Sequence, residues 1–226
     1  MKILNLYAGI GGNRKLWGNE HEVTAVEINE DIAGAYKSNF PNDNVIVGDA
    51  HQYLLEHYKE FDFIWTSPPC PTHSVLNYSM PIKRYPSMVV YQEIILLKNW
   101  FKGKFVVENV KPYYDYLIKP SVILGRHPFW TNFNVKGAEF TNIDVARSTA
   151  AELSEDLGIS IPKIQKARLL LRNCVNPKIG LHIFKSSLEE KQEGLSAFNK
   201  PNTHLFDKQS LSNTKKLKVS SVKENK

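Results

Sequence analysis

The chain has 226 residues, of which 42% are hydrophobic and 11% aromatic, and its formal net charge is +6. This length and composition predict one globular domain with a substantial core and exclude a chain too polar to fold. No run of about 18 uncharged apolar residues is present and the first apolar run is short, so we expect neither a membrane span nor a signal peptide.

The cysteines, histidines and charged residues bear on the cellular compartment, on metal binding and on the character of the C-terminal residues. Cys70 and Cys174 are too few for a disulfide framework, and the seven histidines show no metal-ligand spacing, so we expect no metal and a reducing cytoplasm. Between Asp207 and Lys226 six lysines accompany two acidic residues, which places +4 of the +6 there. We predict that residues 191–226 form a basic, disordered tail, whose role is either weak phosphate attraction or simple solubilisation.

Short apolar runs alternate with helical segments in the first half of the chain. Such alternation predicts an α/β fold with a doubly wound, mostly parallel sheet. Residues 71–86 form a long polar loop, of the kind that often carries function. We expect strands at residues 3–7, 22–26, 44–47, 61–65, 105–108 and 130–135, and helices at residues 13–18, 30–39, 49–58, 88–101 (with Ser87 as N-cap), 149–157, 163–170 and 177–187.

A glycine-rich turn at residues 7–12 (Tyr-Ala-Gly-Ile-Gly-Gly) follows the first expected strand. Glycine lets the backbone turn sharply and lets a ligand lie against it, although the spacing is not that of the dinucleotide motif. Glu27 ends the second strand, where a carboxylate can accept hydrogen bonds from ribose hydroxyls. Asp49 follows the third strand and either contacts an adenine amino group or caps the next helix. Without a phosphate-binding lysine motif, these residues favour S-adenosylmethionine over ATP.

Residues 67–70 (Ser-Pro-Pro-Cys) follow the fourth expected strand. The two prolines end sheet hydrogen bonding and stiffen the turn. Cys70 is then placed at the ligand crevice of an open α/β sheet, where a thiol can act as a nucleophile; the alternative is a small buried cysteine in an ordinary loop. Glu108 ends the fifth strand, so we expect it to face the same crevice as Cys70.

In chain order these segments resemble the motifs of the DNA cytosine-5 methyltransferase family, as a short member of bacterial or phage type. Residues 6–12 resemble the family's cofactor loop, with Tyr7 in place of its usual phenylalanine. Residues 67–74 resemble its catalytic Pro-Cys loop, with Pro71 in place of the common glutamine and His73 in place of the common phenylalanine.

Two further segments, residues 108–110 (Glu-Asn-Val) and 172–177 (Arg-Asn-Cys-Val-Asn-Pro), extend the resemblance. It implies an S-adenosylmethionine-dependent methyltransferase (Rossmann-like) fold and a single catalytic domain over residues 1–190. The resemblance implies catalytic roles for Cys70, Glu108 and Arg126 and cofactor contacts from Tyr7, Ala8, Gly9, Ile10, Gly11, Gly12, Glu27, Ile28, Asp49, Ala50, Pro69, Asn173, Cys174 and Val175.

The chain departs from the family pattern at two places. The family's Gln-x-Arg-x-Arg motif is absent, and residues 125–130 supply only Arg126 as a candidate to contact the base and its sugar edge. Between residues 133 and 163 there is room for only a reduced target-recognition region, which we assign to about 134–163. We therefore expect a short or degenerate target, or dependence on a specificity partner.

The resemblance implies a definite chemistry on double-stranded DNA. Cys70 would attack carbon 6 of a flipped-out cytosine, and Glu108 would hold or protonate the ring at N3 and the exocyclic amine. S-adenosylmethionine would donate the methyl group. The loop of residues 71–86 would cover the flipped base, with phosphate contacts from Asn77, Ser79, Lys83 and Arg84.

Three other interpretations remain open from the sequence. Methyltransferases acting on exocyclic amines also use a Pro-Pro segment but follow it with an aromatic residue, where this chain has Cys70. RNA is a possible substrate, because the carbon-5 chemistry is the same. The third is a non-catalytic or partner-dependent protein that binds cofactor or DNA, which the missing arginine motif and the short recognition region motivate.

Overall fold

The computed structural model describes residues 1–75, 77, 80–82, 84–141, 145–162 and 166–189, so the predicted tail lies outside the described residues. In chain order the elements are β1 (Lys2–Leu6), β2 (Glu22–Glu27), α1 (Glu30–Asn39), β3 (Asn44–Val47), α2 (Ala50–His57), the 3-10 helix η1 (Tyr58–Glu60), β4 (Phe63–Thr66), α3 (Val89–Trp100), β5 (Lys104–Glu108), β6 (Val122–Leu124), β7 (His127–Thr131), α4 (Ala150–Leu157), α5 (Ala167–Arg172) and α6 (Pro177–Leu188).

The seven strands form one sheet in the order β3-β2-β1-β4-β5-β7-β6. Neighbouring strands from β3 to β5 run parallel, whereas β7 is antiparallel to both β5 and β6. Along the chain, the sheet first grows from β1 outward to β3 and then restarts on the other side of β1 with β4. Such a switch point places the ligand crevice at the carboxyl ends of β1 and β4. The prediction of a doubly wound, mostly parallel sheet is confirmed.

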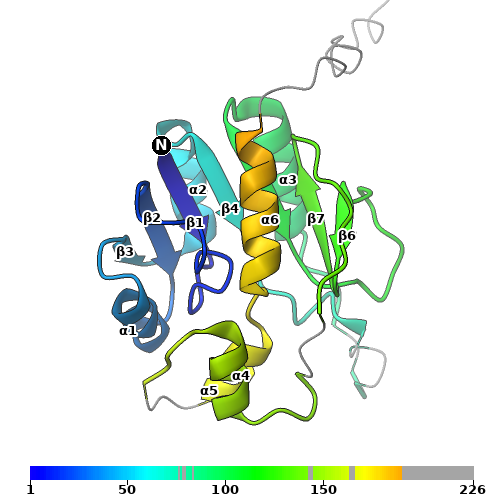
Figure 1. The fold of residues 1–226 in the computed structure, drawn as a ribbon. Coiled ribbons are helices and arrows are strands. Elements are labelled where there is room, and N and C mark those ends of the chain that lie inside the picture. The colour runs from blue at the N-terminus through cyan, green and yellow to red at the C-terminus, as the bar shows by residue number, and fades with distance from the viewer. Residues whose placement is uncertain (76, 78–79, 83, 142–144, 163–165, 190–226) are drawn as a thin grey trace, which may run out of the picture. The chain divides into compact units, whose positions relative to one another are not determined.

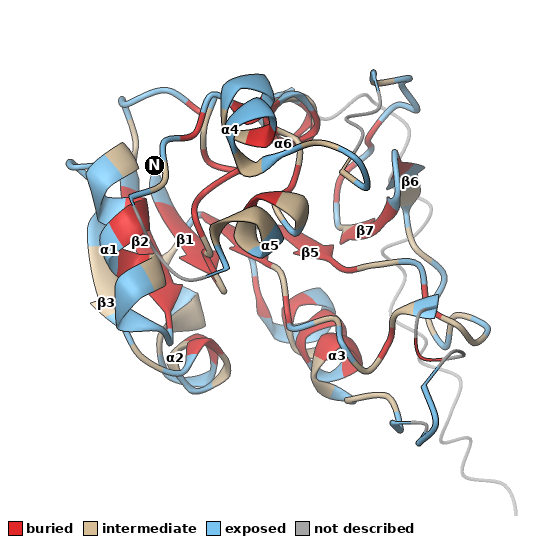
Figure 2. Cartoon of the chain, turned by 90° about the horizontal axis from the view of Figure 1, so that it is seen from below, coloured by how far each residue is buried: buried red, intermediate tan, exposed pale blue. Residues whose placement is uncertain are grey.

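Helices cover both faces of the sheet, because its central strands are apolar on both sides. Helix α6 lies across one face, and α2 and α3 lie on the opposite face (Figure 1). Burial follows this layering: the central strands are buried, the outer strands β3 and β6 are partly exposed, and the helices expose their outer sides (Figure 2). On the α6 face, Trp17 stacks on Phe184 with ring centroids 5.0 Å apart. On the other face, Leu4, Leu6 and Ile64 pack against α2 and α3.

A pair of short helices, α4 and α5, packs beside the carboxyl end of β1. Leu153 and Leu157 of α4 and Leu171 of α5 form a buried cluster with Ile10 of the glycine-rich turn. Thr149 caps α4 through a reciprocal pair of hydrogen bonds with Glu152. Of this helix pair, α4 falls within the predicted recognition region of about 134–163 and packs on the first turn, whereas α5 lies beyond it; residues 142–144 and 163–165 are outside the described part.

The predicted elements of the first half are confirmed to within two residues at each end, with one exception. Residues 13–18 form single turns instead of the predicted helix. The reason is tertiary: the guanidinium of Arg14 makes two 3.0 Å hydrogen bonds to the buried carboxylate of Asp43, and Gly18 adopts a φ of +87°. Local helix preference is weak against a buried bidentate ion pair.

Three predictions elsewhere are corrected. β7 ends at Thr131, so the strand predicted at 130–135 begins earlier and is shorter, and β6 was not predicted at all. Met88 is the N-cap residue of α3 instead of Ser87, although the Ser87 hydroxyl still accepts a long hydrogen bond of 3.4 Å from the Val89 amide. The predicted helix at 163–170 begins at Ala167 within the described residues. Among the described residues no helix is both long and apolar enough to cross a membrane.

Candidate active site

The glycine-rich turn after β1 has an unusual backbone. Tyr7, Gly9 and Gly11 all have positive φ angles, of 53°, 54° and 83°. A Cβ atom at Gly11 would lie 2.2 Å from the ring of Phe40, and one at Gly12 would lie 2.1 Å from the Sγ atom of Cys174. The last two glycines are therefore required by close packing. The second contact also brings residues 173–175 against the turn, as the resemblance implies for one cofactor pocket.

The carboxylate of Glu27 lies at the end of β2, directly beside this turn. It is buried, and its two oxygens accept hydrogen bonds from the backbone amides of Gly9 and Asn29, both at 3.0 Å. Each carboxylate oxygen offers two lone pairs, so both can still accept a ligand hydroxyl. The neighbouring Ile28 is 70% exposed, and Val47 at the end of β3 is 51% exposed. An orientated acid beside exposed apolar side chains suits a ligand with a ribose and a flat ring.

Asp49 caps α2, since its carboxylate accepts a 2.9 Å hydrogen bond from the Gln52 amide. The sequence left open whether Asp49 caps the helix or contacts a ligand. The structure shows that one of its carboxylate oxygens caps the helix. Ala50 is buried behind Asp49. Both residues lie at the same edge of the sheet as Glu27, which the parallel pairing of β2 and β3 ensures.

The Pro-Cys loop begins at the end of β4 and is held from both sides. The Asn109 side chain donates a 2.9 Å hydrogen bond to the carbonyl of Pro68, which ties the loop to the end of β5. Trp65 donates to the hydroxyl of Ser67 at 3.0 Å. The carbonyl of Cys70 accepts the amides of His73 and Ser74, so a tight turn starts at the cysteine. Pro69 lies within this braced segment.

Cys70 and Glu108 lie at the carboxyl ends of the paired strands β4 and β5. Burial raises the pKa of Glu108 to about 7, and a hydrogen bond from Ser67 and the charge of Arg126 oppose that rise. Burial, followed by the charge of Glu108, raises the pKa of the half-buried Cys70 thiol, while Arg126 lowers it. The three predicted catalytic residues therefore influence one another electrostatically.

Arg126 lies in the turn between β6 and β7, and His127 is the first residue of β7. The guanidinium of Arg126 donates a hydrogen bond to the carbonyl of Arg172 at the end of α5. The imidazole Nε2 of His127 lies 3.7 Å from Oε1 of Glu108, and burial together with the charge of Arg126 lowers the pKa of His127 to about 3. His127 is thus a neutral imidazole against a buried acid.

The sequence analysis missed His127. It shares a strand face with Phe129, which is paired in register with Glu108, so alternation along β7 points both side chains to the Glu108 side. A lone polar residue at the start of an otherwise apolar strand was the available signal. It was not usable, because the strand itself was predicted to begin at residue 130.

In the loop after Cys70, the predicted contact of Asn77 with a phosphate is wrong. Asn77 is buried, and its amide group donates to the carbonyl of Arg84 and accepts from the Arg84 amide, at 2.8 and 3.1 Å. Its side chain braces the loop and is not presented to a phosphate. Arg84 is exposed, while Ser79 and Lys83 lie outside the described residues.

Two neighbouring features bear on the site. The buried His73 ring contacts the hydroxyl of Tyr114 at 2.6 Å, which anchors the start of the loop on residues 112–114. Burial raises the pKa of Cys174 to about 12, so this second thiol is a packing residue beside Gly12. In the described part of the chain, no three His, Cys, Asp or Glu side chains are grouped so as to hold a metal ion.

The amino-acid sequence of this chain is similar to those of known proteins. A family model described as C-5 cytosine-specific DNA methylase matches residues 1–115. The tRNA (cytosine(38)-C(5))-methyltransferase of Spodoptera frugiperda is 41% identical over 75 residues, covering 30% of this chain and 23% of that protein. The type II methyltransferase M.Bsp6I of Bacillus sp. is 30% identical over 115 residues, covering 49% and 36%. M.AquIA of Picosynechococcus sp. is 28% identical over 120 residues, covering 49% and 48%. The chain spans less than half the length of these relatives.

Proposed function

Because the chain belongs to the C-5 cytosine-specific DNA methylase family, we propose that it methylates carbon 5 of a flipped-out cytosine in double-stranded DNA through a covalent adduct with Cys70. The observation that carries this proposal is that Cys70, in the loop after β4, and Glu108, at the end of the neighbouring strand β5, influence each other's charge, both within the residues that the family model matches. A thiol and a buried acid side by side form a reactive pair.

The residues at the ends of β1, β2 and β3 fit S-adenosylmethionine as the cofactor. Glu27 keeps acceptor lone pairs for ribose hydroxyls, Ile28 offers an exposed apolar surface to an adenine ring, and Asp49 lies where it can meet the adenine edge. A Cβ atom at Gly9 would meet no atom closer than 4.0 Å, so a ligand can lie close to the backbone there, whereas Gly11 and Gly12 are required by packing within the protein. When bound, S-adenosylmethionine supplies an electrophilic methyl group.

Cys70 and Glu108 would divide the remaining chemistry. Carbon 5 of cytosine is a weak nucleophile, and addition of the Cys70 thiolate to carbon 6 turns the ring into an enamine that can be methylated. Glu108 has a pKa of about 7, so at neutral pH it is available in its protonated form to donate to N3 as electrons move into the ring. After methyl transfer, loss of the carbon-5 proton breaks the bond between sulfur and carbon 6, and N3 returns its proton.

Arg126 and His127 would control charge around this pair. The pKa of Cys70 is raised by burial, and the positive charge of Arg126 favours the thiolate that the reaction needs. We propose that Arg126 also contacts the base or its sugar edge. His127, neutral and 3.7 Å from Glu108, places a polar ring against this acid without a positive charge that would favour its ionised form.

Covalent trapping tests the proposed function. DNA that contains 5-fluorocytosine cannot lose its carbon-5 substituent, so an active Cys70 remains bonded to carbon 6. With S-adenosylmethionine present, we expect a covalent complex that survives denaturing electrophoresis, and none with the Cys70→Ser variant. A wild-type protein that binds the cofactor and DNA but traps no DNA would support the non-catalytic alternative.

RNA is the second candidate substrate, because a tRNA (cytosine(38)-C(5))-methyltransferase is among the relatives with the highest identity. The catalytic residues would act identically on either nucleic acid. Transfer of a labelled methyl group to equal amounts of duplex DNA and of tRNA, in separate and in mixed reactions, decides between them. We expect DNA to be labelled; labelling of tRNA alone would replace the DNA proposal and leave the roles of Cys70 and Glu108 intact.

We also propose limited sequence selectivity. In its described part the predicted recognition region, about residues 134–163, contains one helix, α4, which packs with Ile10 and leaves few side chains to read bases. Because each good base contact supplies only about 1–3 kcal/mol, a target of roughly two to four bases or a specificity partner is expected. Bisulfite sequencing of DNA methylated by the purified protein tests this; a sharply defined target of six or more bases would contradict it.

A further inference from the structure

A buried carboxyl group, that of Glu93 on α3, has no part in the chemistry described above. Glu93 lies on the same helix face as Val90, Ile94 and Leu97, and none of its surface is exposed. Burying a carboxyl group in an apolar layer is costly unless hydrogen-bond donors surround it. A glutamate at such a position therefore indicates a specific set of partners.

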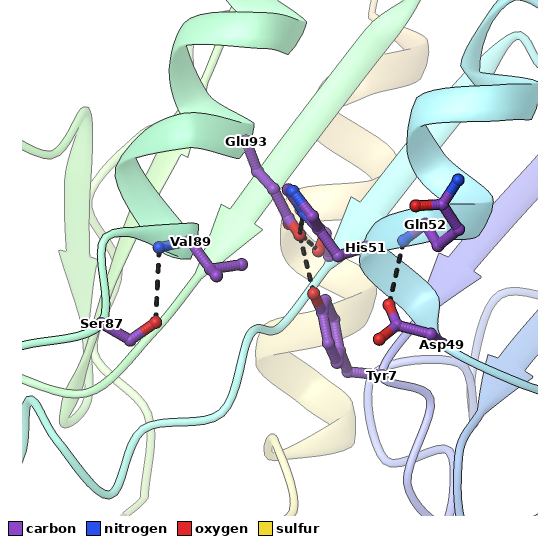
Figure 3. A network of polar contacts seen from close by, with 8 residues as sticks. Tyr7, Asp49, His51, Gln52, Ser87, Val89 and Glu93 are labelled. Carbon is purple, nitrogen blue, oxygen red and sulfur yellow. Dashed lines mark hydrogen bonds and ion pairs between the residues drawn. The ribbon is translucent and has the colours of Figure 1, made fainter.

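Three donors surround Glu93, and each comes from a different element. The Tyr7 hydroxyl donates to Oε1 at 2.8 Å, the Nδ1 atom of His51 lies 2.9 Å from the same oxygen, and the Thr66 hydroxyl donates to Oε2 at 2.5 Å. Tyr7, in the turn after β1, and His51, in α2, converge on Glu93 next to Asp49 (Figure 3). We call Tyr7, His51, Thr66 and Glu93 the Glu93 cluster.

Each donor is next to a segment of the proposed active site. Tyr7 begins the glycine-rich turn, Thr66 immediately precedes the Pro-Cys loop, and His51 lies two residues after Asp49. One carboxyl group on α3 therefore contacts the first residue of the glycine-rich turn, a residue close to Asp49, and the residue just before the Pro-Cys loop. Glu93 itself has no exposed surface through which it could contact a ligand.

The contact with Tyr7 acts on a strained residue. Tyr7 has a φ of +53°, a strained backbone conformation that residues other than glycine rarely adopt. Burial and the neighbouring Glu93 raise the pKa of Tyr7, so its hydroxyl remains a proton donor. The family's usual phenylalanine could not make this bond. The hydroxyl is thus a feature of this chain that helps hold the start of the turn in its strained form.

We propose that Glu93 is a positioning residue that sets the glycine-rich turn through Tyr7 and the Pro-Cys loop through Thr66. The assignment of what each segment does rests on the proposed function, but the positioning itself does not. It makes a specific prediction: the two arms of the Glu93 cluster affect different properties of the protein.

Two single-hydroxyl deletions separate the arms. Tyr7→Phe should weaken S-adenosylmethionine binding by about three- to tenfold, the effect of one hydrogen bond, and leave the alkylation rate of Cys70 within twofold. Thr66→Val should change the alkylation rate of Cys70 by about threefold or more and leave cofactor affinity within twofold. Glu93→Gln, which loses one of two acceptor oxygens, should affect both. Tyr58→Phe removes a hydroxyl from η1 at the opposite edge of the sheet and should affect neither.

Calorimetry measures the affinity for S-adenosylmethionine. Without any ligand, mass spectrometry measures the rate at which Cys70 is alkylated, and amide hydrogen exchange measures the order of residues 7–12. In Tyr7→Phe and Glu93→Gln, exchange across residues 7–12 should be faster, while the melting temperature reports general stability. If wild-type protein binds no S-adenosylmethionine, the proposed function fails, and exchange and alkylation still decide the inference. Unchanged exchange and alkylation in Glu93→Gln, with only a lower melting temperature, would reduce Glu93 to a folding residue and overturn it.

Discussion

The carboxyl edge of the sheet contains two polar regions of opposite character. On the side of β1 to β3, Glu27 accepts two backbone amides, and at the junction of β1 and β4 the carboxyl group of Glu93 on α3 is surrounded by three side-chain donors. On the side of β4 to β7, burial shifts Cys70, Glu108 and His127 toward their neutral forms. The acidic groups of the first region are already hydrogen-bonded before any ligand binds, whereas the neutral groups of the second region can become charged when a substrate enters.

This contrast explains how one sheet edge can serve two tasks. A binding site gains affinity when its polar groups are already held in place, because less order has to be created on binding. A catalytic site gains rate from groups whose pKa values have been moved toward the working pH. Substitutions on the first side should therefore change binding, and substitutions on the second side should change chemistry and its pH dependence.

The largest expected effect is that of Cys70→Ser. A serine hydroxyl does not ionise near neutral pH and is a far weaker nucleophile, so methyl transfer should fall by about a thousandfold or more. Cofactor affinity, measured by calorimetry, should stay within twofold, because the braced loop does not need the thiol. The Cys174→Ser variant, altered at the buried cysteine, should still form the covalent complex with 5-fluorocytosine DNA. Wild-type methylation by Cys70→Ser would refute the assignment of the nucleophile.

The next effect is on stability, through Glu108→Gln. The pKa of Glu108 rises from 4.5 in a solvated glutamate to about 7 in the folded protein. The folded state thus binds a proton that the unfolded state releases, so this contribution is fully present below about pH 4.5 and lost as pH rises through 7. From pH 5 to 8, wild type should lose about 3 kcal/mol of unfolding free energy relative to Glu108→Gln.

The comparison with Glu108→Gln is needed because His127 titrates in the opposite sense. Its folded pKa is lowered from 6.5 to about 3, so its contribution is lost as pH falls below 6.5. The two effects oppose each other between about pH 4.5 and 6.5, and only the difference between matched variants isolates one of them. Denaturant unfolding at several pH values measures it, with Glu22→Gln as the exposed control. A constant difference across this range would show that Glu108 is not shifted.

Glu27→Ala should weaken S-adenosylmethionine binding by about 1–3 kcal/mol, the range for a charge-assisted hydrogen bond. The same variant frees the amides of Gly9 and Asn29, so part of the loss comes from a less ordered turn. Glu22→Ala removes an exposed carboxylate from the amino end of the same strand and is the matched control. Equal affinity of Glu27→Ala and wild type in calorimetry would remove Glu27 from the cofactor site.

The smallest effect is expected for Arg126→Ala. Loss of its charge near Cys70 and Glu108 should lower the methylation rate about tenfold, as expected for one charge-assisted contact. Because a contact with the base or sugar edge of any flipped cytosine carries little sequence information, the choice of sites should not change. Rates at individual sites from bisulfite sequencing measure both quantities, with Lys102→Ala as a control for lost positive charge. Normal rates at all sites would contradict the role given to Arg126.

The sheet could be predicted from the sequence because its information is local. Apolar runs of strand length alternate with helical segments, and parallel strands bring their following residues to one edge. That reasoning predicted Cys70 and Glu108 at the same edge of the sheet, after the strands that the structure pairs as β4 and β5. The antiparallel pair β6 and β7 escaped it, because β6 has only three residues and β7 contains a proline.

Residues whose role depends on distant partners were not predictable in the same way. Glu93 interrupts an apolar helix stripe, which is a visible signal, but its partners lie 27, 42 and 86 residues away. Arg14 lies in a segment with helical preference, and the carboxylate that overrides it is 29 residues away. Packing, not pattern, decides such positions, and they became visible only with the fold.

The stacking of Trp17 on Phe184 has a consequence for synthesis on the ribosome. Trp17 is buried, donates to the carbonyl of Gly180 at 3.3 Å, and lies 5.0 Å from the ring of Phe184. A nascent chain that has emerged only as far as β7 therefore exposes Trp17 and Phe63, because their cover in α6 has not yet left the exit tunnel. The core around Trp17 and Phe63 therefore cannot be completed until α6, the last described helix, has been synthesised. Contacts between residues so far apart in the sequence slow folding.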